Sequence, residues 1–147
     1  MSLKDRIQED MKAAMRSGAK DRLGTIRLIL AAIKQREVDE RIILDDAQLI
    51  AVLEKMAKQR RESITQFQSG GRPDLVAKEN AELDVIAAYM PAQLSARDLD
   101  ALIEAAITQT GAASIKDMGK VMAVIKSSAQ GRADMGAVGA RIKARLG

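Results

Sequence analysis

Apolar side chains recur at three- and four-residue steps along nearly the whole chain of 147 residues. Leu3, Ile7 and Met11 start the pattern, and a helix places residues with this spacing on one face. Outside the segments with this spacing, no alternation of apolar and polar residues lasts four residues. The sequence therefore predicts an all-α protein.

Capping residues and helix breakers divide the pattern into about seven predicted helices. Ser2 with Asp5, and Ser95 with Asp98, have the spacing of a capping box. A charged link from Val38 to Asp45 separates the second helix from the third. The helices are expected up to Gly18, from about Lys20 to Glu37, from the end of that link to Gly70, from Pro73 to Pro91, from Ser95 to Gly111, from about Ser114 to Lys126, and from after Asp134 to Leu146.

Pro91 marks the predicted boundary between two domains. A helix cannot continue through it, because proline lacks the backbone donor and restricts the residue before it. A chain of this length can form one compact domain or two small ones. We therefore predict a multihelical protein of two parts: an N-terminal domain of about four helices over residues 1–92, and a small C-terminal three-helix bundle over residues 93–147.

The residue types that are missing exclude most kinds of catalysis. The chain has no Cys and no His, which excludes disulfides, thiolate nucleophiles, imidazole bases and nearly every zinc site. Gly111 to Lys120 has wrongly spaced glycines for a phosphate-binding loop, and Val121 replaces the Ser or Thr that holds magnesium. We predict no catalytic residue, no metal site and no cofactor.

No apolar run approaches the roughly 18 residues that a membrane span requires. The first residues, Met1 to Arg6, are too polar for a secretory signal. The expected localisation is therefore cytoplasmic, with no membrane partner.

Positive charge is concentrated near the C-terminus. The whole chain carries +4, whereas residues 111–147 carry seven basic side chains against Asp117 and Asp134. Clustered positive charge favours phosphate polymers as partners, although a solvated surface is the alternative. The candidate nucleic-acid-binding residues are Lys116, Lys120, Lys126, Arg132, Arg141, Lys143 and Arg145.

Four glycines accompany these cations, at positions 119, 131, 136 and 139. Glycine destabilises a helix interior, so the cluster indicates either close helix packing or a backbone that approaches a ligand. The single Phe67 and single Tyr89 lie elsewhere, so any nucleic acid here would be recognised through its phosphates and its shape.

A secondary basic surface is predicted in the N-terminal half. Lys20, Arg27 and Lys34 are seven residues apart, which returns to nearly the same side of a helix. Arg60 and Arg61 add a basic stretch on the third helix. The alternative is that these long side chains only cover the edge of the apolar core.

Several short segments occur in a characteristic order over essentially the whole chain. They are Arg27-Leu28-Ile29, Ala31-Ala32-Ile33-Lys34, Lys58-Gln59-Arg60-Arg61-Glu62-Ser63-Ile64 with Phe67, Glu79, Glu82-Leu83, Tyr89-Met90-Pro91-Ala92-Gln93-Leu94, Asp117-Met118-Gly119-Lys120-Val121-Met122 and Gly131-Arg132-Ala133-Asp134. The most specific are the Tyr-x-Pro-x-x-Leu junction and the Asp-Met-Gly-Lys-Val-Met segment. Together these segments resemble the YqeY-like family.

The resemblance implies a helical protein whose C-terminal part is similar to the tail domain of the GatB component of the aspartyl/glutamyl-tRNA amidotransferase. That tail contacts tRNA, whereas the chemistry lies in other domains and in another component of the enzyme. The family is often labelled as a carbon–nitrogen ligase with glutamine as amide donor. We interpret the label as inherited through the tail domain.

Three functions follow from these observations. The leading hypothesis is an accessory protein that binds tRNA through residues 93–147. The alternative is a protein interaction module that docks on amidotransferase subunits or on another translation component. An independent amide-transfer enzyme is the third hypothesis, and the absence of Cys, His and an amidase loop argues against it.

Overall fold

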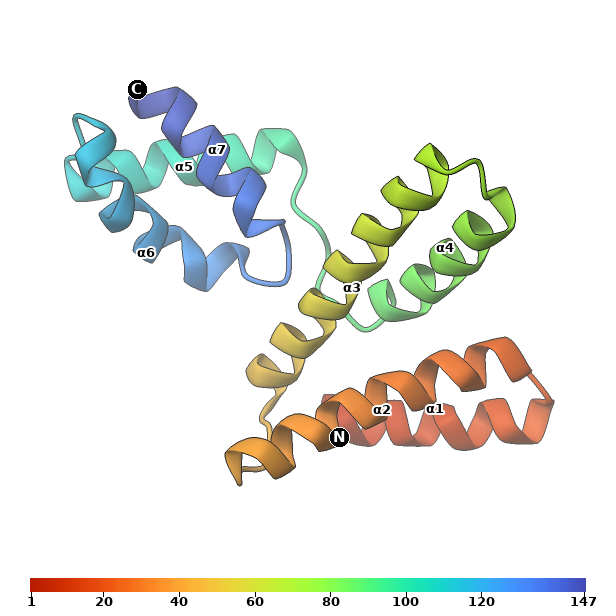
Figure 1. Cartoon of the computed structure of the whole chain (residues 1–147). Coiled ribbons are helices and arrows are strands. Elements are labelled where there is room, and N and C mark those ends of the chain that lie inside the picture. The colour runs from red at the N-terminus through yellow and green to blue at the C-terminus, as the bar shows by residue number, and fades with distance from the viewer. The chain divides into compact units, whose positions relative to one another are not determined.

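The structure is a computed structural model that describes all 147 residues. It contains seven α-helices, one short 3₁₀ helix and no strand, which confirms the predicted all-α class and the number of helices. The elements are α1 Leu3–Ser17, α2 Lys20–Glu40, α3 Asp46–Ser69, α4 Pro73–Ala87, α5 Ala96–Thr110, the 3₁₀ helix η1 Ile115–Asp117, α6 Met118–Ala129 and α7 Met135–Leu146 (Figure 1). No helix is long and apolar enough to cross a membrane.

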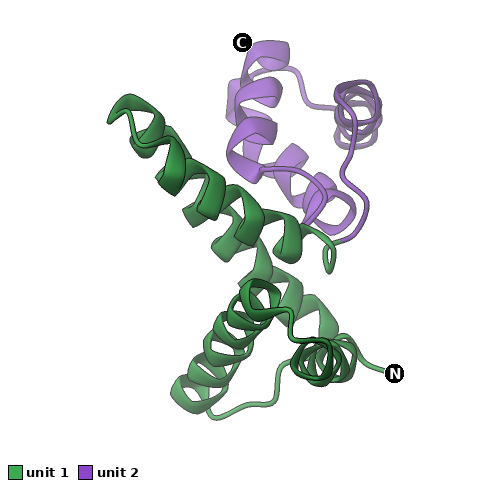
Figure 2. Cartoon of the chain, turned by 90° about the vertical axis from the view of Figure 1, so that its right-hand side faces the viewer, with its two compact units in different colours: residues 1–90 green, residues 91–147 purple.

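The chain forms two compact units (Figure 2). Unit 1 is Met1–Met90, with helices α1 to α4, and unit 2 is Pro91–Gly147, with helices α5 to α7. Each unit has its own cluster of buried apolar side chains. The domain boundary after residue 92 stays a prediction, two residues from this division.

The first helix begins and ends where its sequence indicates. The Ser2 hydroxyl accepts a hydrogen bond from the Asp5 backbone amide at 3.1 Å, and the Asp5 carboxylate accepts one from the Ser2 amide at 3.3 Å. These two bonds form the predicted capping box. Gly18 ends the helix in the left-handed region, with φ of 73°, which glycine adopts without a steric penalty.

The second helix is longer than predicted. It continues past Glu37 to Glu40, because its polar residues form stabilising pairs four positions apart. Arg36 pairs with Glu40 at 2.5 Å, and Gln35 donates to Asp39 at 2.9 Å. The charged link is therefore only five residues, 41–45. Charged residues alone did not distinguish a solvated helix end from a loop.

Three other helix ends also differ from the prediction, namely the end of α4 and both ends of α6, which continues past the expected Lys126 to Ala129. One expected capping box is only half formed. α4 ends at Ala87, before Pro91, and the chain turns through residues 88–90. Ser95 caps α5 by accepting from the Asp98 amide at 3.0 Å, but only this half of the expected capping box is formed. The helix expected from Ser114 starts as the 3₁₀ turn η1 and becomes α-helical at Met118.

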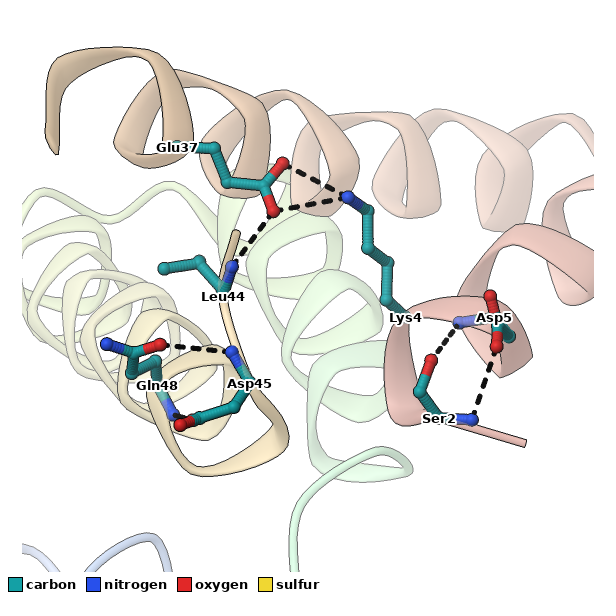
Figure 3. A network of polar contacts seen from close by, with 7 residues as sticks. All are labelled: Ser2, Lys4, Asp5, Glu37, Leu44, Asp45 and Gln48. Carbon is teal, nitrogen blue, oxygen red and sulfur yellow. Dashed lines mark hydrogen bonds and ion pairs between the residues drawn. The ribbon is translucent and has the colours of Figure 1, made fainter. Parts of the chain in front are cut away.

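The link between α2 and α3 is held by Glu37 (Figure 3). Its carboxylate accepts the Leu44 backbone amide at 3.0 Å and the Lys4 ammonium at 3.1 Å. The bond from Leu44 and then the one from Lys4 lower the pKa of Glu37 below its ordinary value. Asp45 then caps α3 by accepting from the Gln48 amide at 2.8 Å. Polar contacts of this one carboxylate therefore join α1, α2 and the link.

Unit 1 is built from two pairs of adjacent helices, α1 with α2 and α3 with α4 (Figure 1). One face of α2 is fully buried in this core through Ile26, Ile29 and Ile33. Leu49 and Leu53 of α3 meet this face in the same core. The remaining core residues include Ile7, Ala14, Leu44, Met56, Ala57 and Ile86.

Tyr89 closes unit 1 just before Pro91. Its ring is buried, and its hydroxyl donates to the Asp10 carboxylate of α1 at 2.6 Å. The Arg6 guanidinium lies over the ring, 5.1 Å from its centroid, and Arg22 of α2 lies 3.9 Å from Asp10. The segment that follows α4 is thus fastened to α1 by the one tyrosine of the chain.

Unit 2 is a three-helix bundle with a core of aliphatic side chains. Leu99, Ile103 and Ala106 come from α5, Val121, Ile125 and Ala129 from α6, and Val138 and Ile142 from α7. The segment leading into α5 lies along the α6–α7 turn, where the Leu94 amide donates to the Arg132 carbonyl at 2.7 Å. Gln93 donates to the Gly131 carbonyl at 2.9 Å.

Candidate nucleic-acid interface

The exposed side of α6 combines small residues with lysines. Val121, Ile125 and Ala129 bury one side of the helix, so the opposite side faces outward. Gly119, Ala123 and Ser127 form an exposed strip there, and Lys120 and Lys126 lie on its two edges, about 120° apart around the helix axis. We call these five residues the α6 platform. Its small side chains leave room for a phosphate backbone between two cations.

Lys116 lies directly before this platform, in the turn η1. The turn is held by Ser114, which accepts the Lys116 amide at 3.3 Å, and by Asp117, which accepts the Ala113 amide at 3.0 Å. The hydrogen bond from Ala113, followed by that from Ser114, lowers the pKa of Asp117. Lys120 forms an ion pair with this carboxylate at 3.9 Å, and its side chain is 70% exposed, so its ammonium group remains accessible to solvent.

The remaining predicted residues do not join the platform. Arg132 uses its guanidinium within the fold, where it donates to the Ala92 carbonyl at 3.0 Å and to the Ser128 carbonyl at 3.5 Å. Lys143 is exposed on α7 and makes no ion pair. It lies about 200° around the helix from Arg141 and Arg145. The seven predicted residues therefore occupy several places on unit 2.

Arg141 and Arg145 pair with two carboxylates of α5. Arg141 donates to Asp100 at 2.7 Å, and Arg145 donates to Glu104 through two nitrogens, one of them at 3.0 Å. The hydrogen bonds of this second pair lower the pKa of Glu104 and raise that of Arg145. Sequence analysis counted these carboxylates only in the net charge. Their spacing of four residues, which equals the spacing of the two arginines, was the one signal from which the pairing could have been predicted.

The secondary basic surface is partly assembled in unit 1. Lys20, Arg27 and Lys34 are all exposed on α2. On α3, Arg61 is exposed, whereas the Arg60 side chain is only 16% exposed. Its Nε lies 3.4 Å from the Glu82 carboxylate, across the α3–α4 pair. Arg60 therefore connects two helices, and the other four residues present their charge to solvent.

The four glycines of unit 2 have different structural roles. A Cβ on Gly139 would lie 3.3 Å from the Met118 side chain, so this glycine allows α7 to pack against α6. Gly131 has φ of 77°, which the turn before Arg132 requires. Gly136 lies in the first turn of α7, where Asp134 accepts its amide at 3.2 Å. A Cβ on Gly119 would meet nothing within 4 Å, so packing does not explain this residue.

We expect Gly119→Ala and Gly139→Ala to differ in their effect on stability. Both gain the helix preference of alanine, worth at most about 1 kcal/mol. Only Gly139→Ala also requires a neighbour, the flexible Met118 methyl, to shift by a few tenths of an ångström, which offsets part of that gain. Chemical denaturation should show Gly119→Ala to be the more stable of the two variants. Equal stability would show that Gly139 has space around it.

Comparison with known proteins gives one family and several relatives. The model of the family described as "Yqey-like protein" matches residues 4–146. A protein of Pyrenophora tritici-repentis named "Altered inheritance of mitochondria protein 41, mitochondrial" is 36% identical over 131 residues, which cover 87% of this chain and 71% of the relative. Proteins of the same name are 44% identical over 87 residues in Eremothecium gossypii and 35% identical over 95 residues in Saccharomyces cerevisiae.

The matches to these last two relatives cover 58% and 64% of this chain, and 48% and 51% of the relatives' own length. This chain therefore spans about half of each of these proteins. The names of all three relatives describe them as mitochondrial. The cytoplasmic localisation of this chain stays a prediction.

Proposed function

The chain belongs to the YqeY-like family, and from this membership we propose that it is an accessory protein that binds tRNA through unit 2. The observation that carries the proposal is the α6 platform with Lys116 beside it. Three lysines there come from one stretch of chain, and the centre of the platform has no bulky side chain. The resemblance of this part of the chain to a tRNA-contacting tail domain supports the same partner.

The proposed recognition uses phosphates and shape. Lysine is a flexible point charge, which suits contacts to the backbone of a folded RNA better than the reading of bases. The exposed backbone at Gly119 lets a phosphate approach the first turn of α6, where the helix dipole favours negative charge. Such binding positions an RNA and performs no chemistry on it.

The proposal treats the ligase label of the family as a statement about the complete amidotransferase. Amide transfer from glutamine requires a nucleophile that takes the acyl group and a base that activates the nucleophile. The platform offers lysines and one serine, Ser127, whose hydroxyl donates to the Val124 carbonyl of its own helix at 3.4 Å. We therefore assign this face a role in binding.

Salt-dependent binding of unfractionated tRNA tests the proposal. Binding through phosphates releases counterions, and each contact changes the slope of log affinity against log salt by about 1. The Lys116→Gln/Lys120→Gln/Lys126→Gln variant should therefore lose about three from the slope, measured between about 50 and 200 mM salt. Its helices should remain folded, because all three side chains are exposed.

A matched variant on α2 is the control. Lys20→Gln/Arg27→Gln/Lys34→Gln removes the same charge from the secondary basic surface. Both variants lose binding equally if only net charge matters. A larger loss of tRNA affinity in the α2 variant would show that the interface lies on unit 1. Absence of tRNA binding by the unchanged protein at micromolar concentration would overturn the proposal.

A second candidate function is docking of a protein partner on unit 1. A groove of about 810 Å³ lies between α2 and α4, with Gly24, Leu28, Ala81 and Val85 among its lining residues. Leu28 is 46% exposed and lines this groove, so it offers an apolar side chain to a partner. Recovery of a specific protein after nuclease treatment, and its loss in Leu28→Glu, would favour this function.

A further inference from the structure

Two arginine–carboxylate pairs cross from α7 to α5 in unit 2. Arg141 bonds to Asp100, and Arg145 bonds to Glu104. Both arginines and both carboxylates are four residues apart, so the pairs lie about one helical turn, or roughly 6 Å, from each other. The four charges thus form two parallel bridges on one face of the bundle.

These bridges lie at the surface. All four side chains are between 41% and 60% exposed. They line a depression of about 420 Å³ together with Ile103 and Ala144. Ala144 lines this depression beside the two arginines with a small side chain. A ligand therefore has both access to the guanidinium groups and room beside them.

Bridges of this kind exchange partners easily. An exposed ion pair contributes little net stability, because water already solvates both charges well. A guanidinium binds carboxylates and phosphates through the same planar fork of N–H donors. A phosphate that replaces Asp100 or Glu104 therefore keeps the geometry of the bond.

We propose that Asp100 and Glu104 are selectivity residues that occupy Arg141 and Arg145 in the free protein and release them only to neighbouring phosphate groups carried by one molecule, such as an RNA strand. This proposal deepens the proposed function, on which it rests, by naming the ligand of these two arginines. Successive phosphates of one RNA strand are a distance apart similar to that between the bridges. A single small anion can bind only one of the two arginines, whereas a strand with neighbouring phosphates can replace both carboxylates together.

The proposal predicts that removing either carboxylate tightens binding. We expect Asp100→Asn and Glu104→Gln each to raise the affinity for unfractionated tRNA by up to about fivefold at about 50 mM salt. This factor corresponds to the free energy of one exposed ion pair, which the ligand no longer has to break. Asp98→Asn is the matched control, since Asp98 is exposed on the same helix and makes no ion pair. It should change the affinity less than twofold, an effect of net charge alone.

A second measurement reads the arginines directly. In nitrogen–proton correlation spectra of the arginine Nε groups, sodium tripolyphosphate should shift Arg141 and Arg145 together, at lower concentration in Glu104→Gln than in the unchanged protein. Sodium chloride at equal ionic strength should shift neither. Thermal unfolding of the variants should stay close to that of the parent, because both bridges are exposed.

The outcomes separate this proposal from the proposed function. If the parent binds tRNA but Asp100→Asn and Glu104→Gln bind no more tightly than Asp98→Asn, the selectivity role is wrong and the tRNA-binding function remains. If no protein binds tRNA but tripolyphosphate shifts both arginines, the selectivity role stands and the tRNA-binding function is wrong. If tripolyphosphate shifts neither arginine, the selectivity role is overturned.

Discussion

Ile142→Ala is expected to lower the free energy of unfolding of unit 2 by about 2–5 kcal/mol. The Ile142 side chain is 0% exposed and packs in a cluster that draws on all three helices of the unit. Truncation removes apolar contacts and leaves a cavity that the helices fill only in part. Unit 2 has fewer than 60 residues, and a core of that size supplies little stability to spare.

Hydrogen exchange of the full chain measures this effect separately for each unit. The amides of α5, α6 and α7 should lose protection in Ile142→Ala, and Ile142→Val should show a loss of only about 0.5–1.5 kcal/mol. The amides of α2 and α3 in unit 1 provide the internal reference. Unchanged exchange in unit 2 would contradict the assignment of Ile142 to its core.

Tyr89 is expected to ionise with a pKa of about 12, well above the ordinary value of 10.0. Burial raises this pKa most, and the hydrogen bond to the Asp10 carboxylate raises it further, because a phenolate beside that charge is disfavoured. The chain has one Tyr and no Trp, so the phenolate absorbance in an alkaline titration reports this residue alone. A midpoint near 10.0 would show that the ring is solvated.

The same shift predicts how stability depends on pH. The folded state holds the phenol proton more tightly than the unfolded state, so the contribution of Tyr89 is complete below pH 10 and is lost as the pH rises through about 12. Tyr89→Phe removes this dependence. At neutral pH it also loses a hydrogen bond to a charged group, worth about 1.5–3 kcal/mol. Denaturant titrations of both proteins at neutral and alkaline pH measure the two effects.

Local signals in the sequence explain how much of the fold could be predicted. A cap or a helix stop depends on residues within one turn, so Ser2, Gly18 and Pro73 marked helix ends correctly. The apolar spacing that includes Ile7 likewise predicted α1, and Ile7 is fully buried. The end of α2 was wrong, because the pairs that extend it are polar and resemble those of a solvated link.

The candidate site was predictable only in part. The lysines of the platform, Lys120 and Lys126, were among the predicted residues, and both are exposed. The partners of Arg141 and Arg145 lie 41 residues away in the sequence, on another helix. Arg60 likewise meets Glu82 across a helix pair. No periodicity within a single helix contains that information.

The sequence by itself determined the all-helical class, most helix ends and the excess of positive charge near the C-terminus. These properties depend on composition and on interactions within a few residues of one another. Only the tertiary structure decided which of these cations are paired with a carboxylate of another helix. Packing places α5 beside α7, so Asp100 and Glu104 neutralise two arginines, while the lysines of α6 remain exposed because no acidic helix covers that face.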